Sequence, residues 1–528
     1  MTIPRALALV AAMSAACALQ AETPRVTVLR SGRNALVRCA FNDKEDLVVD
    51  VQDANEFAYL VAKGTPLAQY KKGRCIHRGT DDFSAMMIDG FGHLSGNHGS
   101  YFGHLLTLPG HGLAEADIGA TVVHGSGERL CIVDVPDGDH LLLHPYGRPG
   151  REPKFKFFSD GAYAYGDRTL APKETNRCQV WPMNRFRVFE WKTSDGKSVP
   201  DGVEVTSDHV DLEMEHDVVD PRSLVEYLHR NPGRRFLPRL TTTRSIAVMD
   251  MERPSAEMAG YMSLSSLLSV KTRFSYQPYC ARTVDRVTRF NVPIASVNAL
   301  DLIYMPNWGD EPFANTFFYI PRLKKMTLTG WNGNPDVEVD LSAGVVMPSP
   351  PWKVSYHVPK SDCLDPEYMP DRFIRIGGRP DRRVGVVLGY SPLHGVSAIE
   401  NRCAERKLAY FFWHTGKMYP YIYNLTDVKA GRTIAHSGYT QYFDPMREPD
   451  ATSFYHHRDG DAHLVYLDFH RSLSGKTIRL PPEFAGKKIS VVERTPSVTL
   501  RSGDVVPADG LVLDVADGRG SLVLKLSD

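Results

Sequence analysis

Short runs in which apolar and polar residues alternate recur along the chain, and a period of two predicts β-strands. In the clearest run, Val203–Val219, apolar side chains alternate with acidic ones: Val205, Val210, Leu212, Met214 and Val218 against Asp211, Glu213, Glu215 and Asp217. The pattern predicts a strand whose apolar face packs on a core while the four acids face water.

Nine other segments are rich in apolar, β-branched and aromatic residues, and we expect each to be a strand. They are Val26–Leu29, Thr121–Val123, Leu130–Val135, His140–His144, Arg185–Trp191, Phe317–Ile320, Val384–Leu388, Leu408–Trp413 and Leu464–Phe469. Turn-forming sequences separate many of them, as at Pro136–Asp139 and Asn332–Pro335. Together the segments predict a chain that consists mostly of β-structure.

Helices are expected at only two places, because 42 Gly and 36 Pro disfavour long helices. Pro221–Arg230 has Asp220 as an N-cap and Pro221 at its first position, and both favour a helix start. Ser255–Val270 is the second candidate. The predicted fold class is therefore all-β: a large β-sandwich of the supersandwich kind, or an irregular propeller. A regular propeller is disfavoured because no internal repeat of about 20–50 residues is present.

The last part of the chain, 471–528, is predicted to form a small antiparallel β-sandwich. Five short apolar segments follow one another there at the spacing that such a sandwich needs: Lys476–Leu480, Lys488–Arg494, Ser497–Leu500, Gly510–Val515 and Ser521–Leu526. No linker rich in Ser, Gly or Pro divides the preceding part. Residues 22–470 are therefore expected to form the main β domain, as one unit or as two packed units.

Residues 1–21 have the layout of a signal peptide. Arg5 precedes an apolar run, and small residues follow up to Ala21, where cleavage is expected. The run is shorter than the roughly 20 residues that a membrane span needs, and no later stretch approaches that length. We expect a secreted or periplasmic protein. Lipid attachment through Cys17 is the alternative, but Ser14 stands where lipoprotein signals usually carry Leu.

Composition narrows the class of protein but not its chemistry. Of 528 residues, 42% are hydrophobic and 23% charged, as in folded soluble proteins. Lys+Arg and Asp+Glu are equal at 62 each, so no overall field attracts nucleic acid, and none is expected as a partner. The cysteines are scattered without a CxxC pair, and most are expected to be small buried hydrophobes.

The densest group of candidate catalytic residues lies in 89–104. His93, Asn97, His98, Tyr101 and His104 stand there among glycines, which disfavour a helix and allow backbone to approach a ligand closely. In a strand that rises about 3.3 Å per residue, His98 and His104 would lie roughly 20 Å apart. That distance is too large for both to bind one zinc ion unless the chain folds back between them. The motifs HExxH, HxH and CxxC are missing from the sequence. A divalent metal, Ca or Zn, stays open as a cofactor, with no ligands assigned.

Asn97, His98 and Tyr101 supply an amide, an imidazole and a phenol. An imidazole can take a proton from the carbon next to a carboxylate, and a phenol can protonate a leaving oxygen. The amide or a guanidinium can share the charge that builds on the carboxylate. In a regular strand Tyr101 would point away from His98, so the pair requires a bend in the chain.

With the export signal, the β-rich body and the small C-terminal sandwich, this segment resembles secreted polysaccharide lyases. Those β-rich enzymes cleave uronate polymers by β-elimination, commonly with Asn, His, Tyr and Arg in the site. The resemblance rests on residue types. It implies Asn97, His98 and Tyr101 as catalytic residues, His93 and His104 as neighbours that bind substrate, and a polysaccharide as the partner.

Two further stretches are candidates for substrate binding. His144, Tyr146 and Arg148 follow a predicted strand, where binding loops often lie, and Arg148 can hold a carboxylate in a bidentate fork. A turn with solvated arginines is the competing interpretation.

The second stretch is aromatic and contains Trp413, His414, Lys417 and Tyr419. Such residues suit stacking on sugar rings, whereas an aromatic strand in the core is the competing interpretation.

The sequence leaves three functions open, and we expect the first. A polysaccharide lyase needs the acid and base described above. A glycoside hydrolase needs two carboxylates about 5–10 Å apart in a cleft, which sequence spacing does not show. A non-catalytic carbohydrate-binding or scaffold protein needs only the aromatic stretch. No GxSxG, P-loop or GxGxxG motif stands in its proper strand–helix context, which disfavours serine hydrolases and nucleotide-binding proteins.

Overall fold

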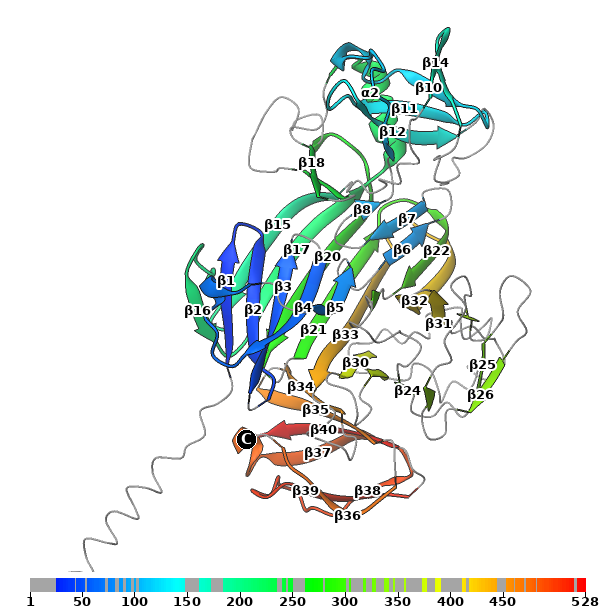
Figure 1. The fold of residues 1–528 in the computed structure, drawn as a ribbon. Coiled ribbons are helices and arrows are strands. Elements are labelled where there is room, and N and C mark those ends of the chain that lie inside the picture. Colours follow the sequence, from blue (N-terminus) through cyan, green and yellow to red (C-terminus); the bar gives the residue numbers. More distant parts are fainter. Residues whose placement is uncertain are drawn as a thin grey trace, which may run out of the picture.

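The computed structural model is an all-β protein with several antiparallel sheets (Figure 1). It describes residues 25–42, 44–52, 55–71, 75–80, 85–88, 92–95, 99–100, 104–147, 161–171, 184–234, 240–243, 246–249, 262–278, 281–300, 303–304, 317–319, 325–328, 337–340, 345–346, 356–357, 373–377, 385–390, 411–414, 417–443, 453–459, 461–469, 472–480, 482–516 and 520–528. The expected signal segment, residues 1–21, lies outside these ranges.

Two large sheets form the body of the molecule. The first has fourteen strands: β16 (Glu204–Ser207), β1 (Val26–Ser31), β2 (Asn34–Ala40), β3 (Glu45–Gln52), β4 (Asn55–Ala62), β5 (Cys75–Thr80), β23 (Ile303–Tyr304), β32 (Lys417–Val428), β22 (Ile294–Leu300), β6 (Ala85–Ile88), β7 (Gly92–Ser95) and β8 (Gly99–Ser100), with β31 (Phe411–His414) and β28 (Tyr356–His357) branching from β32. The second has nine: β15 (Asn184–Thr193), β17 (Val210–Val219), β20 (Ser266–Gln277), β21 (Ala281–Phe290), β33 (Thr433–Phe443), β30 (Gly385–Tyr390), β29 (Phe373–Gly377), β24 (Phe317–Tyr319) and β27 (Val345–Val346).

Smaller sheets stand at the two ends of this body (Figure 1). A six-stranded sheet contains β14 (Arg168–Leu170), β13 (Tyr163–Tyr165), β10 (Thr121–His124), β11 (Arg129–Asp134), β12 (His140–Gly147) and β9 (His104–Thr107). The C-terminal part contains β34 (Ser453–Asp459), β35 (Ala462–Phe469), β40 (Gly520–Ser527) and β37 (Lys488–Arg494) in one sheet, and β36 (Leu473–Ile478), β39 (Leu511–Val515) and β38 (Val498–Leu500) in another. Two hairpins, β18 (Leu240–Thr243) with β19 (Ile246–Met249) and β25 (Lys325–Leu328) with β26 (Val337–Asp340), complete the described strands.

The two large sheets pack face to face, so the body is a sandwich. The buried indole of Trp191 in β15 donates to the carbonyl oxygen of Arg33, in the turn between β1 and β2 of the other sheet, at 2.9 Å. Arg282 of β21 donates to Glu56 of β4 across the interior, and the two side chains are almost wholly inaccessible. Burial raises the pKa of Glu56, while the Arg282 charge opposes that rise. Removal of either partner would leave an uncompensated buried charge between the two sheets, which would destabilise their packing.

Each of the nine predicted strands and of the five C-terminal ones overlaps a strand of the structure. Ile320, Val384 and residues 408–410 of the predicted segments lie outside the described residues. The helix predicted over Pro221–Arg230 is α2, with the same bounds, and the Asp220 carboxylate accepts from the Arg222 backbone N–H as an N-cap. The helix predicted at Ser255–Val270 is wrong at its C-terminal end, because Ser266–Val270 begins β20. Its buried leucine and valine residues continue the alternation of that long strand, and pairing with β17 outweighs local helix propensity.

The acidic face predicted for Val203–Val219 is also partly wrong. The run divides into β16 and β17, and the Asp211 and Asp217 side chains are buried, whereas Glu213 and Glu215 are half-exposed. Arginines on neighbouring strands pair with both buried aspartates, which allows their burial.

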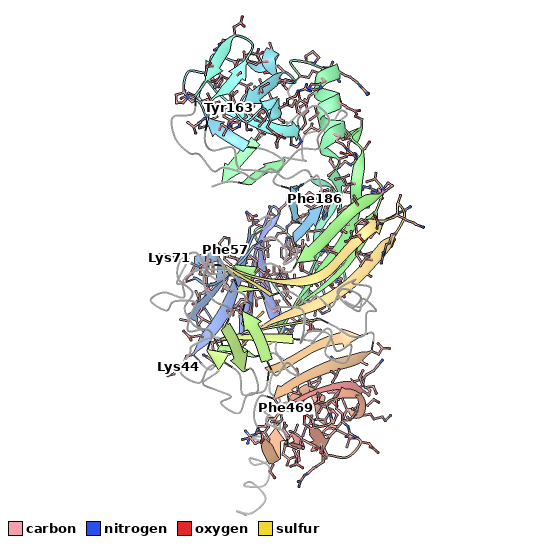
Figure 2. All side chains as sticks on the ribbon, turned by 90° about the vertical axis from the view of Figure 1, so that its right-hand side faces the viewer. Lys44, Phe57, Lys71, Tyr163, Phe186 and Phe469 are labelled. Atoms are coloured by element: carbon pink, nitrogen blue, oxygen red, sulfur yellow. The ribbon has the colours of Figure 1, made fainter. Side chains whose placement is uncertain are left out.

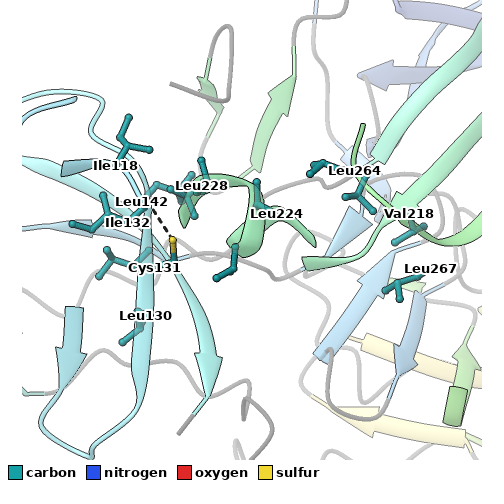
Figure 3. Packing of buried hydrophobic residues seen from close by; sticks show 14 of the residues in the cluster. Ile118, Leu130, Cys131, Ile132, Leu142, Val218, Leu224, Leu228, Leu264 and Leu267 are labelled. Carbon is teal, nitrogen blue, oxygen red and sulfur yellow. Dashed lines mark hydrogen bonds between the residues drawn. The ribbon is translucent and has the colours of Figure 1, made fainter. Parts of the chain in front are cut away.

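Helix α2 joins the six-stranded sheet to the sandwich through one continuous hydrophobic core (Figure 3). Leu224 and Leu228 of α2 pack against Cys131 and Leu142 of the sheet, while Val218 lies on the sandwich side of the same cluster. Burial raises the pKa of the Cys131 thiol to about 12. Cys131 and Cys39 are both buried, as expected of cysteines that serve as small hydrophobic side chains.

The C-terminal sheets enclose a second core of their own, as Figure 2 shows around Phe469. Val465, Leu467 and Phe469 of β35 belong to this core, and β35 pairs with β40 along its whole length. The first strand of this sandwich, β34, therefore begins at Ser453, upstream of residue 471, where the sequence predicts the start of the domain. The domain boundary at residue 471 stays a prediction.

Candidate functional site

The structure distributes the sequence-predicted site residues over two sheets. Asn97, His98, Tyr101 and Arg148 lie outside the described residues, so their roles stay predictions. His93 lies in β7 of the fourteen-stranded sheet.

The aromatic stretch belongs to the same large sheet as His93. Trp413 and His414 lie in β31, and Lys417 and Tyr419 lie in β32, which is separated from β7 by β22 and β6. Trp413 pairs with Met418, and Tyr419 with Phe412, so the two aromatic candidates are not cross-strand partners.

His104, His144 and Tyr146 lie together in the six-stranded sheet. His104 pairs with Leu143, the neighbour of His144. The His144 side chain is buried, whereas the Tyr146 side chain is half-buried. The chain enters β9 at His104, four residues after β8 ends at Ser100, so this end of the small sheet is tied to the segment that carries the predicted catalytic residues.

Tyr146 is the extra residue of a β-bulge. Leu130 pairs with Pro145 and Arg129 pairs with Gly147, which leaves Tyr146 between them without a partner in the strand ladder. A bulge redirects a side chain from the regular alternation, and bulges are common beside active sites. The bulge brings Tyr146 toward residues of three other elements.

Thr121 of β10, Arg129 of β11 and His229 of α2 surround the Tyr146 ring. The Tyr146 and Thr121 hydroxyl oxygens are 2.5 Å apart, within hydrogen-bond distance. The Arg129 guanidinium carbon lies 4.8 Å from the ring centroid, in cation–π geometry. The His229 ring meets the Tyr146 ring edge-on, with centroids 5.6 Å apart and planes inclined by 81°. These four residues are called the Tyr146 cluster below.

The Tyr146 cluster combines accessibility with charge. His229 is exposed, and Arg129 and Thr121 are half-buried, so a ligand can reach the polar groups. Within the described part of the chain, no carboxylate pairs with Arg129. Desolvation lowers the pKa of His229, and the Arg129 charge lowers it further, so the imidazole is mainly neutral at neutral pH. The cluster thus holds a base, a phenol and a cation.

Close backbone packing holds α2 in place beside the sheet. A Cβ on Gly119 would lie 2.5 Å from the carbonyl oxygen of Leu228, the residue before His229, and Gly119 has a φ of +91°. The Gly233 N–H donates to the carbonyl oxygen of Ile118 just beyond the helix. Only glycine allows this approach, so the position of His229 depends on Gly119.

The sequence pointed to Tyr146 but not to its partners. His229 carries only one local signal, its place in the last turn of a predicted helix. Thr121 and Arg129 lie in or beside predicted strands and belong to no motif. The bulge that redirects Tyr146 depends on the pairing of β11 with β12, which sequence spacing does not reveal.

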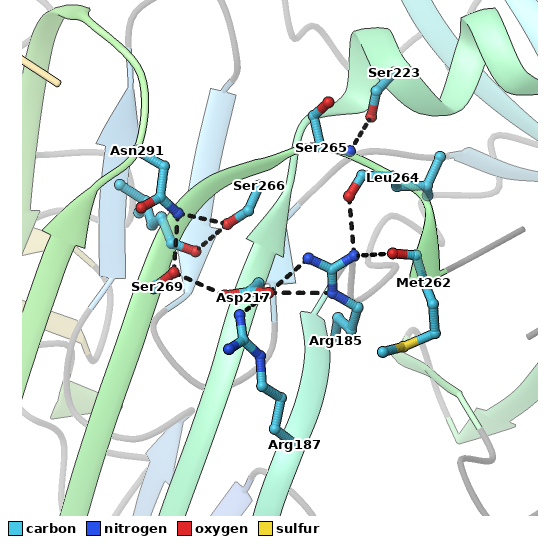
Figure 4. A network of polar contacts seen from close by, with 11 residues as sticks. Arg185, Arg187, Asp217, Ser223, Met262, Leu264, Ser265, Ser266, Ser269 and Asn291 are labelled. Atoms are coloured by element: carbon cyan, nitrogen blue, oxygen red, sulfur yellow. Dashed lines mark hydrogen bonds and ion pairs between the residues drawn. The ribbon is translucent and has the colours of Figure 1, made fainter. Parts of the chain in front are cut away.

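A second polar network, at the end of the sandwich near α2, centres on Asp217 (Figure 4). Arg185 donates to Asp217 Oδ2 at 2.6 Å, Arg187 donates to the same oxygen at 2.5 Å, and Ser269 donates to Oδ1 at 2.8 Å. Arg185 also donates to the carbonyl oxygens of Met262 and Leu264.

Burial alone would raise the pKa of Asp217, but the hydrogen bonds from Arg187, Arg185 and Ser269 hold it below its usual value of 3.8. The Asp217 carboxylate is 1% exposed and bonded at both oxygens. This network therefore stabilises the junction between the sandwich and α2 and leaves no group for proton transfer.

Metal and membrane sites receive no support from the described residues. Among them, no three His, Cys, Asp or Glu side chains are close enough to hold a metal ion. Within the same residues, no helix is long and apolar enough to cross a bilayer.

Comparison with known proteins leaves the family of this chain undefined. No family model and no curated protein matches it. Among solved structures, a galactose mutarotase related enzyme from Lactobacillus acidophilus is 7% identical, with a TM-score of 0.24, and covers 54% of this chain and 78% of its own. A GalM/aldose epimerase homologue from C. elegans is 8% identical, with a TM-score of 0.25, covering 80% and 99%. A galactose mutarotase-like protein from Lactobacillus casei is 9% identical, with a TM-score of 0.26, covering 77% and 99%. Scores this low carry no argument about fold or function, so the functional conclusion rests on the site.

Proposed function

We propose that the protein is a secreted or periplasmic carbohydrate-active enzyme, a polysaccharide lyase that cleaves a uronate-containing glycan by β-elimination. The observation that carries the proposal is the contact between a phenol, a neutral imidazole and a guanidinium at an accessible rim, in Tyr146, His229 and Arg129. These are the three kinds of group that the reaction needs.

Each member of the Tyr146 cluster has one role. Arg129 binds the uronate carboxylate and shares the charge that develops on it when the neighbouring carbon loses its proton. His229 takes that proton, because its lowered pKa keeps the imidazole in the basic form. Tyr146 gives its proton to the leaving glycosidic oxygen. Thr121 holds the phenol by the hydrogen bond between the two hydroxyls.

The first test is product formation by the purified mature protein. It is incubated with acidic and neutral polysaccharides, and the ultraviolet absorbance of an unsaturated uronate is followed with and without a chelator. We expect absorbance to rise on an acidic polymer only. New reducing ends without this absorbance would instead mean hydrolysis by paired carboxylates, and binding without any product would mean a carbohydrate-binding protein.

The second test assigns the chemistry to residues. We expect Tyr146→Phe and His229→Gln each to lower the elimination rate at least ~100-fold, the usual minimum for loss of a general acid or base. Tyr165→Phe and His140→Gln are matched controls, because both residues lie in the same sheet with partners of their own, Asp117 and Asp137.

Full activity in both site variants would contradict this assignment. If His98→Ala abolished product formation in that case while leaving the fold intact, the chemistry would belong to the Asn97–Tyr101 segment that the sequence predicts.

A further inference from the structure

The acid and the base of the Tyr146 cluster are in direct contact. The His229 and Tyr146 ring centroids are 5.6 Å apart, and the edge of one ring faces the other. A sugar ring between them would need van der Waals contact on both sides, at about 3.5–4.0 Å each, or roughly 7–8 Å in total. No sugar ring fits between the two side chains, so a substrate must lie on one side of both.

The surrounding structure keeps the two rings together. Thr121 holds the Tyr146 hydroxyl from β10, and the bulge fixes the Tyr146 backbone. The close contact of Gly119 with the Leu228 carbonyl sets the last turn of α2 against the same sheet. To separate the His229 and Tyr146 rings by the width of a sugar ring, α2 would have to move away from the six-stranded sheet.

We infer that His229 and Tyr146 act on the same face of the uronate ring, so that the enzyme prefers uronates whose acidic proton and glycosidic oxygen lie on one face. This inference rests on the proposed function and narrows its substrate class. In mannuronate and glucuronate linked through the carbon β to the carboxylate, the two groups lie on one face. In guluronate and galacturonate they lie on opposite faces, because one of the two carbons is inverted.

The bond changes balance without any further reactant. His229 takes the proton next to the carboxylate, and the electron pair of that C–H bond forms the new carbon–carbon double bond. The bond from the β carbon to the glycosidic oxygen breaks, and its electron pair stays on the oxygen. That oxygen receives the Tyr146 proton, and solvent then carries the proton of His229 back to the Tyr146 phenolate.

Arg129 occupies the position that this arrangement requires. Its guanidinium lies over the ring face of Tyr146, and its charge acts on His229. It therefore stands beside both acid and base, where the carboxylate of a sugar that contacts both groups would come to lie.

The test compares four homopolymers under one condition: mannuronan, glucuronan, guluronan and polygalacturonate. We expect the initial rate of unsaturated-uronate formation on mannuronan or glucuronan to exceed the rates on the other two at least ~100-fold, a factor within the range that general acid–base catalysis contributes. Tyr146→Phe and His229→Gln must both remove that preferred activity, while Tyr165→Phe and His140→Gln keep it. Circular dichroism and thermal unfolding of each variant show that the fold is retained.

The outcomes separate this inference from the proposed function. Equal or faster elimination on guluronan or polygalacturonate would overturn the same-face geometry and leave the lyase proposal standing. Preferred activity that survives both site variants would overturn the role of the cluster. No elimination on any uronate polymer would overturn both.

Discussion

At the scale of single residues, the environment of His229 sets the pH range in which the site can work. Its pKa is lowered first by desolvation and second by the charge of Arg129. Tyr146 of β12 meets the His229 ring edge-on, and on α2 itself Arg230 pairs with Glu226 at 3.3 Å. The imidazole is therefore a base across the neutral range and becomes protonated only below its usual pKa of 6.5.

Arg129→Gln is expected to raise the pKa of His229, because it removes one of the two causes of the lowering. Desolvation remains, so the pKa should stay below 6.5. Protonation would then begin at a higher pH, and the acidic limb of the pH–rate profile would move upward in pH. The measurement is an NMR titration of the His229 ring, assigned by comparison with His229→Gln. An unchanged or lower pKa in Arg129→Gln would show that the Arg129 charge does not reach His229.

At the scale of elements, α2 packs on the six-stranded sheet through a close backbone contact between Gly119 and Leu228, which a single added methyl group would disturb. Gly119 has a φ of +91°, and a Cβ there would meet the Leu228 carbonyl oxygen at 2.5 Å. We expect Gly119→Ala to lower the free energy of unfolding by about 1–3 kcal/mol through backbone strain, and to lower elimination by moving His229.

Gly138→Ala is the control, because Gly138 lies in a turn of the same sheet with no atom within 4 Å of an added Cβ and no positive φ. Urea unfolding of both variants and of the unchanged protein measures the difference. Equal free energies of unfolding of the two variants would mean that α2 can shift at this contact without any loss of stability.

The elements themselves were largely predictable, because their signals are local. Alternation and short runs of apolar, β-branched and aromatic residues predicted the strands, and the Asp220 cap with Pro221 predicted the start of α2. The helix proposed over Ser255–Val270 was wrong, because Ser266–Val270 pairs with β17 in the folded chain. Solvation of Asp217 was wrong because its arginine partners come from β15 and its serine partner from β20.

The Tyr146 cluster escaped prediction for a related reason. Its members come from three strands and one helix and span residues 121 to 229, so no short motif contains them. Only Tyr146 carried a signal, its place after a predicted strand. The bulge that redirects it is a property of strand pairing, and pairing is decided by the whole sheet.

At the scale of the whole molecule, the three parts depend on one another to different degrees. The six-stranded sheet shares a continuous core with α2 and with the sandwich strands β17 and β20. Among the residues that the structure describes, the core of the C-terminal sandwich is instead formed by buried side chains between Val465 and Leu526. We therefore expect the C-terminal part, and not the six-stranded sheet, to fold when separated from the rest.

The C-terminal folding unit is expected to begin with β34, at Ser453. A fragment of residues 453–528 contains β34 and β35, and β35 supplies Val465, Leu467 and Phe469 to the core. A fragment of residues 471–528, the boundary predicted from sequence, leaves the β35 side of β40 unpaired and removes these three side chains. We expect the longer fragment to unfold cooperatively in urea and the shorter one to show no transition. Small domains bury a small fraction of their surface and are marginally stable, so the loss of three core side chains would prevent folding. Cooperative unfolding of both fragments with equal midpoints would place the start of the folding unit after β35 and would make β34 and β35 part of the sandwich body.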